Sequence, residues 1–79
     1  MSLHLQPVQI ATDSNDTKSH LVFADGFLVA VLVQLSDEFE DEAGWWFLEA
    51  AFGRVNDFRA PTFPNLEEAQ DWITRQLTS

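Results

Sequence analysis

The strongest constraint on the fold is an apolar stretch at residues 20–53, which would carry hydrophobic side chains on both faces of a sheet. Its apolar runs, at residues 21–24, 27–35 and 45–52, are separated by Asp25-Gly26 and by an acidic segment. An Asp-Gly pair between apolar runs is typical of a two-residue hairpin turn, because both residues tolerate the positive φ of a type I′ turn. We therefore predict a three-stranded antiparallel meander over residues 20–53.

One amphipathic helix is expected after the meander, at residues 65–78. Its apolar stripe repeats at helical spacing and consists of Leu66, Ala69, Ile73 and Leu77. Asn65 is a favourable N-cap, and Glu68 follows three residues later, as in a variant of the capping box. The predicted fold class is α+β, with this C-terminal helix packed on one face of the sheet.

Residues 1–19 are expected to form an N-terminal strand or arm followed by a polar loop. Leu3, Leu5 and Ile10 indicate a weak strand that Pro7 interrupts, which suits a fourth strand at a sheet edge or an ordered arm. We expect residues 1–79 to form a single domain. A core this small is often enlarged by oligomerisation.

The two hairpins predict which side chains share a face. If Val22 faces Val29 and Leu35 faces Gly44, one face is wholly apolar, and we expect the helix there. Its members are Val22, Ala24, Phe27, Val29, Val31, Val33, Leu35, Trp46, Leu48, Ala50 and Phe52.

The second face is almost as apolar as the first. It comprises Leu21, Phe23, Leu28, Ala30, Leu32, Gln34, Trp45, Phe47, Glu49 and Ala51. A monomer rarely exposes a contiguous apolar patch of this kind, so we expect a cover: a second copy, the N-terminal segment, or a different protein or ligand. The predicted dimer or partner face consists of Leu21, Phe23, Leu28, Leu32, Trp45 and Phe47.

Acidic residues dominate the charge of the chain, with thirteen of them against four basic residues and a formal net charge of −9. Such a surface repels phosphate backbones, so direct nucleic-acid binding is not expected. A basic protein is an allowed partner. The residues predicted to steer it form one acidic loop: Asp37, Glu38, Glu40, Asp41 and Glu42.

No catalytic or cofactor motif stands out in the sequence. His4 and His20 are the two histidines, no cysteine is present, and His20 at a strand start is interpreted as a surface or capping residue. The acidic loop lacks the glycine and the spacing of an EF-hand. We therefore predict a non-enzymatic interaction module, a small acidic homodimer without a cofactor. The alternative is a small-ligand or metal-binding protein that uses the apolar sheet face or the loop at residues 37–42.

The sequence favours a cytoplasmic location without membrane association. The first residues lack the basic and apolar regions of a secretion signal. The longest apolar run, at residues 27–33, is shorter than the roughly 20 residues of a membrane helix.

A short motif at the start of the helix resembles the end of several small bacterial β-β-β-α domains. It reads Phe-Pro-Asn-Leu-Glu-Glu-Ala at residues 63–69, and it follows an aromatic strand. Antitoxins of the HicB type share this strand-then-helix pattern. The resemblance covers less than half of the chain, and the additional strand and DNA-binding extension expected of that family are missing. It therefore implies a bacterial domain and assigns no functional residue.

Overall fold

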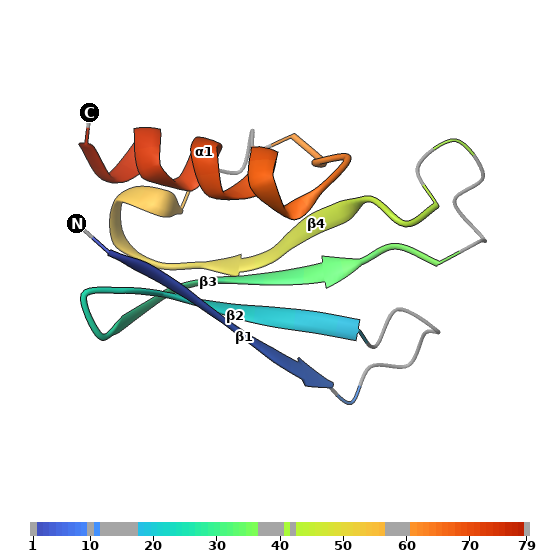
Figure 1. Cartoon of the computed structure of the whole chain (residues 1–79), viewed down its shortest axis with the longest axis horizontal. Coiled ribbons are helices and arrows are strands. Elements are labelled where there is room, and N and C mark those ends of the chain that lie inside the picture. Colours follow the sequence, from blue (N-terminus) through green and yellow to red (C-terminus); the bar gives the residue numbers. More distant parts are fainter. Residues whose placement is uncertain are drawn as a thin grey trace.

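A computed structural model of the chain contains a four-stranded antiparallel sheet, in the order β1-β2-β3-β4, followed by a helix. It describes residues 2–9, 11, 18–36, 41, 43–56 and 61–78. The elements are β1 (Leu3–Gln9), β2 (Lys18–Ala24), β3 (Phe27–Gln34), β4 (Trp46–Ala51), the 3-10 helix η2 (Gly53–Val55) and α1 (Leu66–Thr78). Figure 1 shows α1 lying along one side of the sheet. The α+β class is confirmed, and the N-terminal segment forms the fourth strand.

The strand β1 lies at an open edge of the sheet and pairs with β2. The Ser2 carbonyl accepts a hydrogen bond of 3.0 Å from the Asp25 backbone N–H. Since alternate residues of an antiparallel strand bond to the partner, Pro7 directs its backbone to the free edge, where its missing N–H breaks no ladder bond. The described part of the N-terminal segment therefore extends the sheet and does not cover its second face.

The first hairpin turn has the predicted conformation. Asp25 and Gly26 both have positive φ, at 51° and 88°, which matches the requirement of a type I′ turn. The pairs next to the turn are Ala24 with Phe27, and Phe23 with Leu28, as the turn predicts.

Beyond these two pairs, the predicted register is wrong by one residue. Val22 pairs with Ala30, because Val29 is an extra residue on β3 and forms a β-bulge. The predicted pairing of Val22 with Val29 is therefore wrong.

The second hairpin also departs from the predicted register. The Gly44 N–H donates to the Leu35 carbonyl at 2.9 Å, and the Leu35 N–H donates to the Trp45 carbonyl at 2.7 Å. Gly44 has a φ of 83°, so Gly44 and Trp45 together face Leu35 as a G1 bulge. Gln34 consequently pairs with Trp46 instead of Trp45. A second irregularity in the pairing of β3 with β4 makes Glu49 an extra residue on β4, because Val31 pairs with Ala50 and Leu32 pairs with Leu48.

These bulges move several side chains to the face opposite the one predicted. Ala30 and Leu32 are fully buried in the core beneath α1, and Ala51 packs against it. The residues that exchange with them, and so lie on the face away from α1, are Val31, Val33 and Ala50. Phe27, expected to pack under the helix, is 76% exposed beside the turn.

The core fills the space between the sheet and α1. Ala69 and Ile73 of the helix are fully buried against strand residues such as Val22 and Leu32. The connection after β4 supplies Val55 and Phe63 to the same cluster. Phe63 also exchanges two backbone hydrogen bonds with Trp46, at 2.7 and 2.8 Å, so part of the β4 edge is paired.

Candidate functional site

The first candidate is the sheet face away from α1, which we call the uncovered face because no helix or strand that the structure describes packs on it. Val22 and Ala24 belong to the core, so the alternation along β2 directs Leu21 and Phe23 to the opposite side. Their partners on β3 extend this face, because Phe23 pairs with Leu28 and Leu21 pairs with Val31.

The uncovered face continues across β3 onto β4. Val33 pairs with Phe47 of β4 and with Ser19 of β2. Exposure varies over the face: Leu28 and Phe47 are 37% and 43% exposed, whereas Val33 is 3% exposed. Contiguous apolar side chains thus run from β2 to the β4 edge of the sheet.

Four of the six residues predicted for a dimer or partner face lie on the uncovered face: Leu21, Phe23, Leu28 and Phe47. Leu32 does not, because the bulge at Val29 directs it into the core with no exposed surface. Trp45 is half-buried just before β4 begins. Val31 was missed, since a strand that is apolar at every position gives no signal for a bulge.

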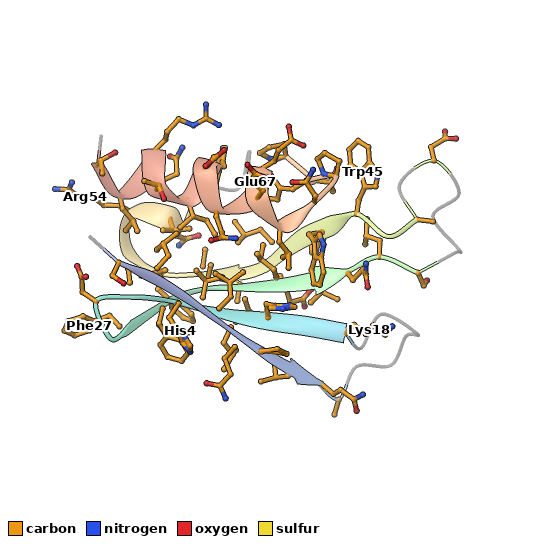
Figure 2. All side chains as sticks on the ribbon, in the orientation of Figure 1. His4, Lys18, Phe27, Trp45, Arg54 and Glu67 are labelled. Carbon is orange, nitrogen blue, oxygen red and sulfur yellow. The ribbon has the colours of Figure 1, made fainter. Side chains whose placement is uncertain are left out.

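Among the described residues, charge is distributed unequally between the two sides of the sheet. Among the described residues of the uncovered face, none is acidic, although the exposed bulge residue Glu49 lies beside it. Glu67, Glu68 and Asp71 belong to α1, on the other side of the sheet. Figure 2 shows Glu67 on the helix and His4, whose ring contacts Phe23 at a centroid distance of 6.3 Å, below the sheet. The described part of the uncovered face is therefore apolar and almost uncharged.

Of the five acids in the predicted acidic loop, the structure describes Asp41, which is exposed. The other members, Asp37, Glu38, Glu40 and Glu42, lie outside the described residues. In the part of the chain that the structure describes, no group of three or more His, Asp or Glu side chains is placed to hold a metal ion.

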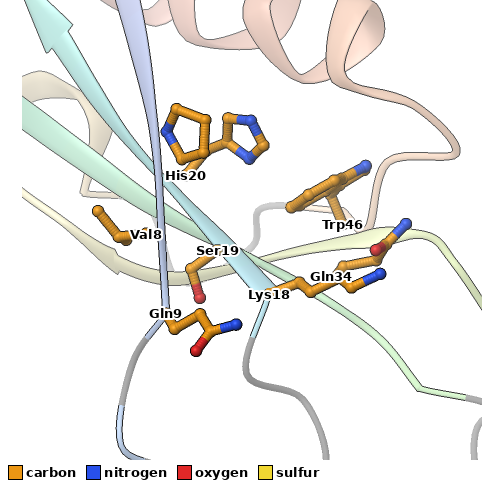
Figure 3. A pocket seen from close by; sticks show the side chains of 8 residues that line it. Val8, Gln9, Lys18, Ser19, His20, Gln34 and Trp46 are labelled. Carbon is orange, nitrogen blue, oxygen red and sulfur yellow. The ribbon is translucent and has the colours of Figure 1, made fainter.

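A second candidate is a hollow of about 550 Å³ at the end of the sheet opposite the Asp25-Gly26 turn. All four strands contribute to it, and Figure 3 shows the labelled side chains around its opening. The described residues that line it are Pro7, Val8, Gln9, Lys18, Ser19, His20, Gln34 and Trp46.

His20 is the most unusual group in this hollow. Its ring stands edge-on to Trp46, with a centroid distance of 5.0 Å and an interplanar angle of 83°. Its Nδ1 atom is buried and has no hydrogen-bond partner. Burial also holds the pKa of His20 below its ordinary value of 6.5, so the neutral imidazole is favoured.

Gln34 is another polar residue that lines the hollow. Its Nε2 donates to the Gly44 carbonyl at 3.0 Å, which holds the amide against the G1 bulge. The sequence pattern predicts Gln34 on the sheet face away from the helix and His20 as a surface or capping residue. The strand register instead places both residues on the α1 side of the sheet. The one available signal was that both are polar residues at the ends of otherwise apolar strands.

Comparison of the chain with protein-family models, with curated proteins and with solved structures finds no match. The described helices include none with the length and apolarity needed to cross a membrane.

Proposed function

We propose that this chain is a non-enzymatic protein-interaction module that acts as a homodimer, with the uncovered faces of two copies in contact. The observation that carries the proposal is the apolar surface made by Leu21, Phe23, Leu28, Val31 and Phe47 on the side away from α1. Apolar surface removed from water contributes about 25 cal/mol per Å², so several large side chains together favour association.

A second copy suits this surface better than a basic protein does. The chain has a formal net charge of −9, so a basic partner would be attracted to its acidic regions. The described residues of the uncovered face carry almost no charge, and Glu67, Glu68 and Asp71 belong to α1 on the other side of the sheet. Two copies related by a twofold axis can therefore bring these faces together while keeping the helical carboxylates apart.

The acidic loop remains a candidate for a second role in the same module. We propose that Asp37, Glu38, Glu40, Asp41 and Glu42 steer a basic protein toward the dimer, in the cytoplasm of a bacterium. Such contacts would change the association rate and its salt dependence more than the buried part of the interface.

The test is the mass of the protein in solution, measured by light scattering. We expect wild type to be dimeric and Phe47→Glu to be monomeric, because the substitution would bury an unpaired carboxylate in the interface. Phe27→Glu is the matched control, since Phe27 is 76% exposed and lies beside the turn on the α1 side. It should remain dimeric.

Two results would contradict the proposal. One is a monomeric wild type at high micromolar concentration. The other is dissociation by Phe27→Glu to the same extent as by Phe47→Glu. Circular dichroism of each variant separates dissociation from unfolding, and Leu28→Gln provides a milder change on the same face.

A further inference from the structure

Among the described residues, one edge of the sheet is open and the other is partly paired. Trp46 of β4 exchanges two backbone hydrogen bonds with Phe63, whereas no described segment pairs with the outer side of β1. An unpaired edge offers its backbone groups to another strand, and many proteins protect such an edge with charged side chains. β1 contains no acid, lysine or arginine, although the chain has a formal net charge of −9. This edge is therefore suited to pairing with a further strand.

The pairing of β1 with β2 determines which backbone groups of β1 point outward. The Asp25 N–H donates to the Ser2 carbonyl at 3.0 Å, so Ser2 and every second residue after it direct their backbone groups to β2. The residues between them direct their backbone groups to the free edge, and these are Leu3, Leu5, Pro7 and Gln9. All four present a carbonyl, but Pro7 has no N–H to donate.

These outward groups are complementary to those of a second copy in one antiparallel register. If a twofold axis passes through Gln6, Leu3 faces Gln9 of the second copy, and Leu5 faces its Pro7. Every outward N–H of the strand then meets a carbonyl, because Pro7 can still accept from Leu5. Moving the axis to Leu5 takes Gln9 beyond the end of the facing strand, and moving it to Pro7 places two residues without an N–H opposite each other. Pro7 therefore selects the register centred on Gln6.

The side chains at this seam are compatible as well. Gln6 pairs with Leu21 of the uncovered face, so its side chain lies on that side and meets Gln6 of the second copy on the axis. A primary amide both donates and accepts, so two of them can bond to each other. On either side, His4 faces Val8 of the second copy, so no two like residues with charge are opposed. Two copies with a formal net charge of −9 can therefore approach along β1 without opposing carboxylates in the strand.

We propose that β1 pairs with β1 of a second copy, antiparallel and centred on Gln6, and so joins the two sheets into one. This contact uses the sheet edge and leaves the uncovered face free, so it is additional to the face-to-face dimer and does not depend on it. Two paired strands bury less surface than the roughly 1,200–2,000 Å² of a stable interface. We therefore expect edge pairing at higher protein concentrations than the face-to-face dimer.

The first test uses single cysteines, because the chain has none of its own. Facing residues that do not exchange ladder bonds have Cα atoms about 4.5 Å apart, which suits a disulfide. Gln6→Cys should therefore form crosslinked pairs of chains when copper phenanthroline is added as the oxidant. His4→Cys is the matched control, because His4 is also exposed but lies roughly 13 Å along the seam from His4 of the second copy. His4→Cys should crosslink poorly alone and well when it is mixed with Val8→Cys.

The second test places opposite charges on the axis. A mixture of Gln6→Glu and Gln6→Lys should associate about two- to fivefold more tightly than either variant alone, because residue 6 meets residue 6. Net charge alone would place the mixture between the two variants. The same pair of changes at Gln9, which is also exposed, should give no gain on mixing, because Gln9 faces Leu3. Sedimentation at high protein concentration measures all four variants and both mixtures.

Three results would overturn the proposal. They are equal crosslinking of Gln6→Cys and His4→Cys, a Gln6 mixture that lies between its two components, and loss of the Gln6→Cys crosslink when Phe47→Glu is added. The last result would assign the contact to the uncovered face, and Leu28→Gln replaces Phe47→Glu if circular dichroism shows that the double variant is unfolded. A crosslink that persists in these backgrounds supports edge pairing even if light scattering finds no face-to-face dimer.

Discussion

His20 combines a buried nitrogen with a lowered pKa, and this predicts how stability responds to pH. Because the pKa is lowered in the folded state, the unfolded chain takes up the His20 proton more readily. Stability from this residue is therefore fully present above pH 6.5 and is lost as the pH falls toward the lower pKa of the folded state.

The corresponding measurement is a series of urea melts between neutral and mildly acidic pH. Wild type should lose stability as the pH falls from 6.5, and His20→Gln should lose less over the same interval. The other titratable groups are retained in this variant, so the difference between the two curves belongs to His20. Parallel curves would mean that His20 titrates alike in the folded and unfolded chains.

Gly44 is a residue whose backbone conformation alone predicts the effect of a substitution. Its φ is 83°, and a Cβ added there would have Gln34 Nε2 as its nearest neighbour, at 3.9 Å. Space is therefore available, but the left-handed conformation is unfavourable for alanine. We expect Gly44→Ala to reduce the free energy of unfolding by about 1–2 kcal/mol in denaturant melts. Gly44→Asn should reduce it less, and a larger loss for Asn would show that side-chain space, not φ, is limiting.

At the scale of the elements, α1 is stabilised by its cap and by one buried stripe. The Glu68 N–H donates to Asn65 Oδ1 at 2.9 Å, as the predicted N-cap requires. Ala69 and Ile73 have no exposed surface, while Trp72 packs its ring against Phe63 at a centroid distance of 5.7 Å. The helix therefore buries the stripe that its spacing predicts.

This burial makes Ile73 and Thr74 a matched pair for testing the helical phase. Ile73→Ala should reduce the free energy of unfolding by about 2–4 kcal/mol, because it leaves a cavity in the core. Thr74→Ala, one position along and only half-buried, should change it by about 0.5 kcal/mol or less. Equal effects in denaturant melts would contradict the packing of α1.

At the scale of the whole molecule, net charge opposes the proposed dimer. Each copy carries a formal charge of −9, so the copies repel each other at low ionic strength. Raising the salt concentration screens this repulsion, and we expect the dimer dissociation constant to fall. Sedimentation at several salt concentrations measures it.

The five loop acids provide the control for this effect. Replacing Asp37, Glu38, Glu40, Asp41 and Glu42 with Ser or Asn removes five negative charges, so the dissociation constant should depend less on salt. If a higher salt concentration instead weakened association of wild type, the dimer interface would have to join opposite charges. That result would contradict a dimer formed through the apolar face. The same variant should capture a basic partner less strongly at low salt.

The sequence by itself determined the features that depend on neighbouring residues. Asp25-Gly26 specified a type I′ turn because those two residues tolerate positive φ. Asn65 and the apolar stripe after it specified the start and phase of α1. The existence of a sheet with apolar residues on both faces also followed from composition, since any register leaves both faces largely apolar.

The tertiary structure alone decided which residues occupy which face. Val29 and Glu49 are extra residues in their strands, and each reverses the alternation beyond it. Residues 27–33 are apolar throughout, so either face suits each of them, and no residue there marks the bulge in the sequence. The hollow likewise joins side chains from Pro7 to Trp46 on four strands, which only long-range strand pairing can bring together.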